Sequence, residues 1–89
     1  MKVYDFSDCD FDNEILSDKN TGVLLSKKFE YNGQEESRVI VSDLNEDKRL
    51  VFLINSREVI EQTGYSDSEI NSVINYLHSI RENLLESIK

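Results

Sequence analysis

The chain has 89 residues, which is the size of one folded domain with a single modest core. Its 18 acidic residues outnumber its 10 basic residues and give a formal net charge of −8 at pH 7, so tight binding to DNA, RNA or an anionic membrane is disfavoured, because phosphate contacts need lysine and arginine. The single cysteine excludes an internal disulfide and a zinc site built from four cysteines.

The N-terminal segment carries most of the negative charge, since residues 2–18 hold six acidic residues and one basic residue. From Asp8 to Glu14 the acidic residues occupy even positions, whereas Phe11 and Ile15 occupy odd positions. This alternation is typical of a half-buried strand. Asp and Asn are poor strand formers, so a loop or an edge strand stays open for this segment.

The middle of the chain has the pattern of an antiparallel meander. Residues 22–31 and 38–42 are strand-like segments on either side of Asn32 and Gly33, a pair that suits the two positive-φ positions of a type I′ hairpin turn. After a polar turn, the nearly continuous apolar run 49–54 predicts a third strand in the centre of the sheet.

The C-terminal third changes to a helical period. Ser66 and Glu69 have the spacing of a helix capping box. Apolar residues then recur at steps of three and four over 70–88, which predicts one amphipathic helix of about 20 residues. A shorter helix is predicted over 57–63. We therefore expect a single α+β domain, residues 1–89, with an antiparallel three- to four-stranded meander sheet covered by a long C-terminal amphipathic helix, and a short helix before it.

No motif for catalysis or for binding a cofactor is present. The single histidine, His78, lies at the edge of the apolar stripe of the predicted long helix. The sequence neighbours of Cys9 are Asp8 and Asp10, whose negative charge disfavours the reactive thiolate. Catalysis by Cys9 and His78 would require the two side chains to meet in a cleft. We expect no enzyme activity and no cofactor.

Part of the N-terminal segment resembles a calcium-binding EF-hand loop. Asp8, Asp10 and Asp12 match the first three acidic positions of that loop. Asn13 stands where the loop needs glycine, and Lys19 stands where it needs a bidentate glutamate. Because two essential positions are lost, we expect no metal site.

A second stretch, residues 56–74, resembles the helix-turn-helix family, with Gly64 in the turn. It departs from that family at Ile60, where a small residue is usual, and its second helix has no lysine or arginine before Arg81. A DNA reader needs basic anchors for phosphates. The alternative function is a helix-turn-helix-like transcriptional adaptor or antitoxin acting through residues 56–77.

The acidic N-terminal residues are candidates for partner binding. Alternate side chains of an extended strand are about 6.6 Å apart, close to the spacing of successive phosphates along a nucleic-acid strand. Such a row fits a basic groove on another protein, and the competing interpretation is a solvated acidic face that serves only solubility. A second acidic pair has helical i, i+4 spacing near the C-terminus. The candidate residues are Asp8, Asp10, Asp12, Glu14, Asp18, Glu82 and Glu86.

In size, negative charge and lack of catalytic motifs, the chain resembles small acidic phage-encoded inhibitors, including anti-CRISPR and other DNA-mimic proteins. The resemblance implies a host-defence nuclease or another nucleic-acid-binding protein as the target. We therefore expect a non-enzymatic protein that inhibits a basic nucleic-acid-handling protein by nucleic-acid mimicry, without binding nucleic acid or a membrane itself. No apolar stretch has the length of a secretory signal or a membrane span, so the expected compartment is the cytoplasm, that of the host cell if the protein is phage-encoded.

Overall fold

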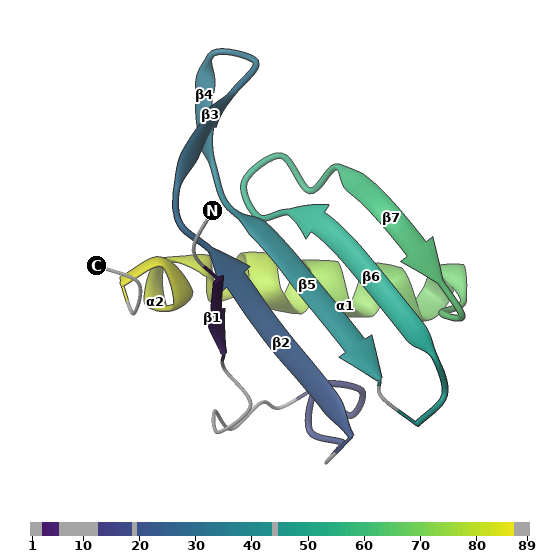
Figure 1. Cartoon of the computed structure of the whole chain (residues 1–89). Coiled ribbons are helices and arrows are strands. Elements are labelled where there is room, and N and C mark those ends of the chain that lie inside the picture. The colour runs from purple at the N-terminus through teal and green to yellow at the C-terminus, as the bar shows by residue number, and fades with distance from the viewer. Residues whose placement is uncertain (1–2, 6–12, 19, 44, 87–89) are drawn as a thin grey trace.

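The computed structural model describes residues 3–5, 13–18, 20–43 and 45–86. These residues form strands and helices in an α+β arrangement (Figure 1). In chain order the elements are β1 (Val3–Asp5), β2 (Thr21–Ser26), β3 (Phe29–Tyr31), β4 (Gln34–Glu36), β5 (Arg38–Asp43), β6 (Lys48–Leu53), β7 (Val59–Thr63), α1 (Asp67–Ser79) and α2 (Arg81–Glu86).

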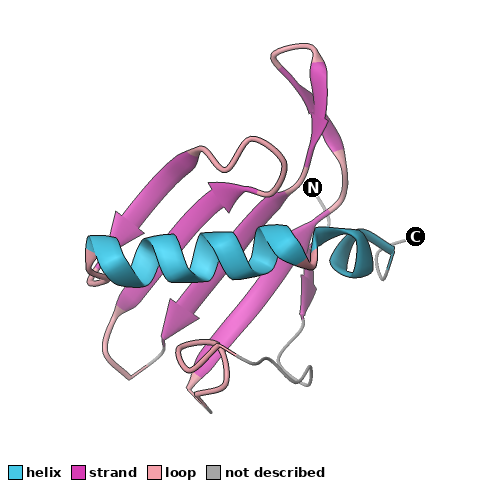
Figure 2. Ribbon diagram, turned by 180° about the vertical axis from the view of Figure 1, so that it is seen from behind, coloured by secondary structure: helices cyan, strands magenta, loops and turns pink. Residues whose placement is uncertain are grey.

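The described strands pair into an antiparallel sheet of five strands in the order β1-β2-β5-β6-β7. β3 and β4 form a separate hairpin that projects beyond this sheet (Figure 1). α1 lies across one face of the sheet, and α2 continues beyond its C-terminal end (Figure 2). The fold therefore has two layers, with a sheet face that these helices leave uncovered.

The core lies between the sheet and α1. Val39 and Val41 of β5 stand opposite Phe52 and Leu50 of β6, and all four are 0% exposed. They belong to one buried cluster with Leu77 of α1. Burial of each large apolar side chain contributes roughly 1.5–3 kcal/mol before conformational entropy is subtracted. The two strands and the helix therefore form the rigid centre of the domain.

Two local predictions are confirmed. Asn32 and Gly33 have φ values of 52° and 82°, as a type I′ turn requires, and they connect β3 to β4. At the start of α1, the Ser66 Oγ accepts a hydrogen bond from the Glu69 N–H at 3.2 Å, and the Glu69 carboxylate accepts one from the Ser66 N–H at 2.9 Å. Both signals involve residues close together in the sequence, so local spacing is enough to predict them.

The predicted long C-terminal helix is wrong, because α1 ends at Ser79. Ile80 has φ −108° and ψ 16°, outside helical geometry, and the separate short helix α2 follows it. The Tyr76 carbonyl still accepts the Ile80 N–H at 3.3 Å, and the last carbonyls of α1 also take side-chain donors. The Ser79 hydroxyl donates to the Tyr76 carbonyl, and the Arg81 guanidinium donates to the His78 carbonyl at 3.0 Å.

The predicted short helix over 57–63 is also wrong, because Val59–Thr63 is strand β7. A tight turn precedes it, in which Arg57 has φ 64° and its N–H donates to the Leu53 carbonyl at 2.8 Å. The β-branched residues of β7 favour an extended backbone, and the free side of β6 supplies its hydrogen-bond partners. The sheet consequently has five described strands rather than three to four.

β7 also removes the helix-turn-helix arrangement from residues 56–74, since the segment expected to form its first helix is a strand. β7 pairs with β6 through a bulge: Phe52 stands opposite Val59 and Val51 opposite Glu61, which leaves Ile60 as an extra residue.

Within the described residues, no helix is long and apolar enough to cross a membrane.

Candidate functional site

Acidic side chains from separate segments of the chain meet at one end of the sheet. They come from the turn over 13–18, the end of β5, the β5–β6 turn and the first turn of α1. Together with Lys48 and Tyr65 they line a hollow of about 200 Å³, which we call the acidic hollow. Its carboxylates give it a formal net charge of −4 after Lys48 is counted. They belong to Glu14, Asp18, Asp43, Glu46 and Glu69.

The turn over 13–18 is fixed to the rest of the domain by both apolar and polar contacts. Leu16 is 3% exposed and belongs to the core cluster. The Asn13 side chain donates to the Ser72 hydroxyl of α1 at 2.9 Å, and the Ser17 N–H donates to the Asn13 carbonyl at 2.9 Å. Glu14 therefore has a defined place beside α1, although its side chain is exposed.

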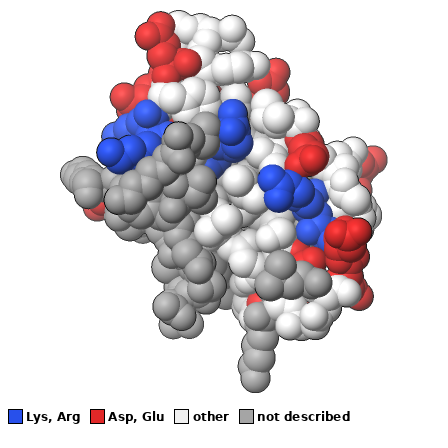
Figure 3. All heavy atoms as spheres, viewed as in Figure 1, with Lys and Arg blue, Asp and Glu red and all other residues white. Residues whose placement is uncertain are grey.

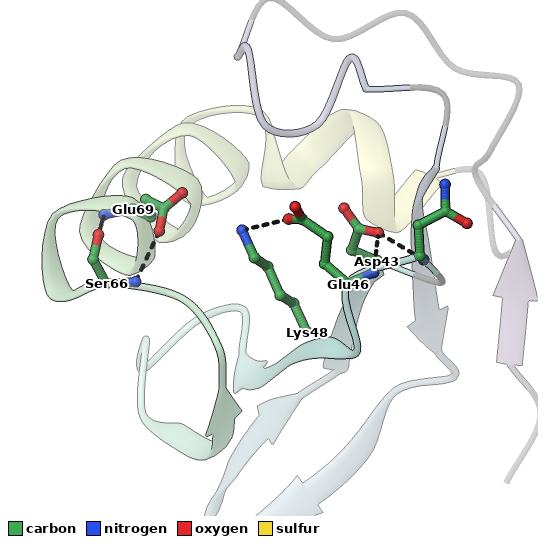
Figure 4. Close-up of polar contacts among 6 residues, drawn as sticks. Asp43, Glu46, Lys48, Ser66 and Glu69 are labelled. Atoms are coloured by element: carbon green, nitrogen blue, oxygen red, sulfur yellow. Dashed lines mark hydrogen bonds and ion pairs between the residues drawn. The ribbon is translucent and has the colours of Figure 1, made fainter.

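The β5–β6 turn positions two further carboxylates. The Asp43 carboxylate accepts hydrogen bonds from the N–H groups of Asn45 at 2.9 Å and Glu46 at 3.1 Å, which is the side-chain pattern of an Asx turn (Figure 4). The Glu46 carboxylate lies 2.9 Å from the Lys48 ammonium group. Figure 4 shows this ion pair between the turn and the N-terminal end of α1.

The first turn of α1 supplies Glu69. Hydrogen bonds from Ser66, through its backbone and then its side chain, lower the pKa of the Glu69 carboxyl group. A negative charge is also favourable beside the N-terminal end of a helix. The capping box that begins α1 therefore also keeps a charged carboxylate in the acidic hollow.

Lys48 and Tyr65 lie against each other in the acidic hollow. The Lys48 ammonium nitrogen is 5.4 Å from the centre of the Tyr65 ring, which is within the range of a cation–π contact. The hydrogen bond to Glu46 raises the pKa of Lys48. Burial, followed by the negative charge of Asp43, raises the pKa of the Tyr65 phenol. At neutral pH the lysine is therefore charged and the phenol is neutral.

The chemistry of the acidic hollow suits a positively charged group. Carboxylates accept hydrogen bonds and attract cations, and the described residues that line the hollow include no histidine and no cysteine. Among the described residues, no group of three or more His, Cys, Asp or Glu side chains has an arrangement that could hold a metal ion. The carboxylates of the hollow suit the positive charge of a cationic side chain.

The sequence-predicted site residues fall in different places. Glu14 and Asp18 lie in the acidic hollow. Glu82 and Glu86 are exposed on α2, at the far end of the helical layer from the start of α1 (Figure 1). Asp8, Asp10, Asp12 and Cys9 lie outside the described residues.

The predicted alternating strand is wrong at Glu14. Residues 13–18 form a turn in which Leu16, at an even position, is buried, so Glu14 does not continue an extended acidic row. A row formed by the preceding aspartates stays a prediction from the sequence. The structure instead places Glu14 beside carboxylates from distant parts of the chain.

Sequence reasoning missed Asp43, Glu46, Lys48 and Tyr65 as site residues, and assigned Glu69 only a capping role. Their local roles were visible, because a polar turn was expected around residues 45–48. Their common location depends on the pairing of β5 with β6 and on where α1 begins, and neither follows from local spacing.

His78 is half-buried on α1 and lies outside the acidic hollow. Burial lowers its pKa, and the positive charges of Arg81 and Arg57 lower it further. The imidazole is therefore neutral at pH 7 and adds no positive charge to the C-terminal end of α1.

The sheet face opposite α1 differs in charge from the acidic hollow. Figure 3 shows Lys and Arg side chains on this face beside Asp and Glu side chains. Arg49 forms an ion pair with Glu61 at 2.5 Å, and the Arg38 guanidinium carbon lies 5.6 Å from the centre of the Phe29 ring. Arg49 and Arg38 on this face therefore have partners within the domain.

Comparisons of the chain with protein-family models, with curated proteins and with solved structures found no match. The acidic hollow is therefore described by the chemistry of its own side chains. Its main property is negative charge held in place by the fold.

Proposed function

We propose that the chain is a non-enzymatic acidic binding protein that inhibits a basic nucleic-acid-handling protein by occupying its nucleic-acid-binding surface. The observation that supports this function is the acidic hollow, where five carboxylates from four segments of the chain line one site together with Lys48. The resemblance to anti-CRISPR and other DNA-mimic proteins suggests a host-defence nuclease in the cytoplasm as the target. The aspartates at positions 8, 10 and 12 precede Glu14 in the sequence and stay candidate partner-binding residues.

The fold holds the carboxylates in place without neutralising most of them. Asp18 accepts a hydrogen bond from the Asn20 N–H at 2.8 Å, and Asp43 and Glu69 accept hydrogen bonds from backbone N–H groups near them. Of the ion pairs within the described residues, only Lys48–Glu46 lies in the acidic hollow. Glu14 and Asp18 are exposed and Glu69 is half-buried, so their negative charge is available to a basic partner.

Such a charge arrangement acts mainly on the rate of association. Complementary charges steer two proteins together and raise the association rate by roughly 10- to 1,000-fold, an effect that falls steeply with salt. A nucleic-acid-binding protein carries the required positive surface, because it contacts phosphates through lysine and arginine. The same surface attracts fixed carboxylates.

A pair of charge-matched variants tests the proposal. The hollow-neutral variant replaces four carboxylates of the hollow by amides that keep a hydrogen-bond-accepting oxygen: Glu14→Gln, Asp18→Asn, Asp43→Asn and Glu46→Gln. The control variant replaces four exposed carboxylates elsewhere: Glu30→Gln, Glu35→Gln, Glu58→Gln and Glu61→Gln. Each variant changes the formal net charge from −8 to −4.

The partner is first captured from a nuclease-treated lysate on the immobilised wild-type chain and is then purified. Stopped-flow measurements give its association rate with each variant, and a fluorescent DNA duplex reports displacement from the partner. We expect the hollow-neutral variant to associate roughly 10-fold or more slowly than wild type and to lose displacement, with the control within about 2-fold of wild type. Equal losses in both variants, or no loss in either, would contradict the proposal.

A gel shift at low salt tests the competing regulator function directly. The proposal expects no retention of a DNA duplex by micromolar protein, because phosphates and the acidic hollow repel each other. Retention of a duplex of defined sequence would favour a DNA-binding regulator instead.

A further inference from the structure

The strongest indication of a ligand in the acidic hollow is an unpartnered hydroxyl group. Tyr65 lines the hollow and is 8% exposed, yet its hydroxyl makes no hydrogen bond within the described part of the chain. Buried polar atoms nearly always have a partner. The phenol lies close enough to the carboxylates for the charges of Asp43, Glu69 and Asp18 to act on it, although burial is the larger influence on its pKa. Within the described residues, the Tyr65 hydroxyl is therefore open to a hydrogen-bond donor that enters this acidic site.

Lys48 shows what kind of group the acidic hollow accepts. Its ammonium nitrogen bonds the Glu46 carboxylate at 2.9 Å and lies over the face of the Tyr65 ring. Among the described residues that line the hollow, Lys48 is the one cation, and it does not reach the Tyr65 hydroxyl as a hydrogen-bond donor. The Lys48 side chain is 24% exposed and can move into solvent when another cation enters.

Size and hydrogen-bonding capacity narrow the choice of cation. The hollow of about 200 Å³ is smaller than the roughly 300–1,000 Å³ of sites for complete small molecules, so it suits a single side chain. An arginine guanidinium is planar and always charged, and it presents five N–H donors and no acceptor. The hollow offers the complementary set, since its carboxylates and the phenol oxygen accept hydrogen bonds from several directions.

We propose that the acidic hollow is the receptor for one arginine side chain of the basic partner, with the Tyr65 hydroxyl oxygen accepting a guanidinium N–H and Lys48 displaced into solvent. This inference rests on the proposed function, because it names the group through which the partner is recognised. It assigns Tyr65 a binding role and makes Lys48 a competitor of the ligand.

The test uses the full chain and a small probe, the amide N-acetyl-arginine-N-methylamide, in an NMR titration of backbone amides. We expect saturable changes at Lys48, Tyr65 and Glu69. The matching citrulline derivative, which has the same shape without the charge, should give no saturable change. The lysine derivative should bind more weakly than the arginine derivative, because it has fewer donors.

Two substitutions probe the assigned roles. Tyr65→Phe removes only the hydroxyl group and should weaken binding of the arginine probe by roughly 2- to 10-fold, whereas Tyr31→Phe on the β3–β4 hairpin should leave it unchanged. Lys48→Met keeps an apolar stem over the Tyr65 ring and removes the competing charge, so binding should tighten by roughly 5-fold. Thermal unfolding of each variant verifies that the fold is retained.

Several results would overturn the inference: equal binding of the citrulline or lysine derivative, unchanged affinity in Tyr65→Phe, or changes at the same amides with Mg²⁺ or Ca²⁺ but not with the arginine probe. The proposed function fails separately. If the hollow-neutral variant loses the partner while the arginine probe does not bind wild type, the acidic surface stands and the arginine receptor is wrong. If the probe binds but partner capture is independent of the hollow, the receptor stands and the proposed function is wrong.

Discussion

Gly64 connects β7 to α1 beside the acidic hollow, and replacing it by alanine should destabilise the domain strongly. Its φ of +82° is a left-handed conformation that costs a residue with a Cβ about 1–2 kcal/mol. A Cβ at this position would lie 2.7 Å from the Lys48 Cγ, 3.3 Å from its Cβ and 3.4 Å from its Cα. The last two atoms are fixed by β6, so Lys48 cannot simply rotate away. Overpacking of this kind adds about 1–3 kcal/mol. The expected loss for Gly64→Ala is therefore about 2–5 kcal/mol.

A double-mutant cycle separates the two contributions. Lys48→Ala removes the Cγ atom and with it the 2.7 Å contact, while the 3.3 Å contact with the Lys48 Cβ stays. In that background the cost of Gly64→Ala should fall toward the conformational part of about 1–2 kcal/mol, with a smaller steric part from the contact that stays. Gly22→Ala is the matched control, since a Cβ there meets no atom within 4 Å and the backbone φ is not positive. It should change stability by less than about 0.5 kcal/mol.

Urea denaturation followed by circular dichroism gives the free energy of unfolding for the wild type, the three single variants and the double variant. A loss of unfolding free energy below about 0.5 kcal/mol for Gly64→Ala would refute this prediction, because both the positive φ of Gly64 and the contact with Lys48 predict a larger loss. A cost that is equal with and without the Lys48 side chain would refute the steric part alone.

Two further predictions concern carboxylates with structural roles. Glu36 is 0% exposed, and its carboxylate accepts hydrogen bonds from the N–H groups of Asn55 at 2.9 Å and Ser56 at 2.8 Å. Glu36→Ala leaves these buried donors without a partner and should lower the free energy of unfolding by about 3–5 kcal/mol, as measured by urea denaturation. A loss below about 1 kcal/mol would contradict this structural role. Hydrogen bonds from Ser66 lower the pKa of Glu69 below its ordinary 4.5, so its contribution to stability is complete above about pH 5 and is lost as the pH falls through the lowered pKa. The stability difference between wild type and Glu69→Gln should therefore be constant from about pH 7 to 5 and shrink below it, and a difference that stays constant down to about pH 3 would exclude the assigned hydrogen bonds.

Local signals in the sequence predicted local structure well. The Asn32–Gly33 turn and the capping box of Ser66 and Glu69 are confirmed because neighbouring residues alone determine their geometry. The apolar period beyond residue 70 correctly marked the buried side of the helical layer, since Leu77 and Leu84 are both in the core. It could not show the break at Ile80, because α2 presents its apolar side to the same sheet.

Errors arose where tertiary contacts decide between two local structures. The spacing of apolar residues in segment 59–63 is compatible with one short helix. The segment instead pairs with the free side of β6 and forms an edge strand. Composition drew attention to Glu14 and Asp18, and the acidic hollow includes both. The carboxylates of the hollow lie up to 55 positions apart in the sequence, from Glu14 to Glu69, and the pairing of β5 with β6 helps to bring them together.

The bulge at Ile60 has a consequence for the outermost strand. β7 is the last strand of the five-stranded sheet, and Val59 and Ile60 are 41% and 50% exposed, a combination that favours edge-to-edge growth with other sheets. The extra residue interrupts the regular ladder of donors and acceptors and increases the local twist, so an incoming strand finds no flat template. One inserted residue thereby protects the domain against fibril-like stacking, and it does so without a lysine or a proline in the strand.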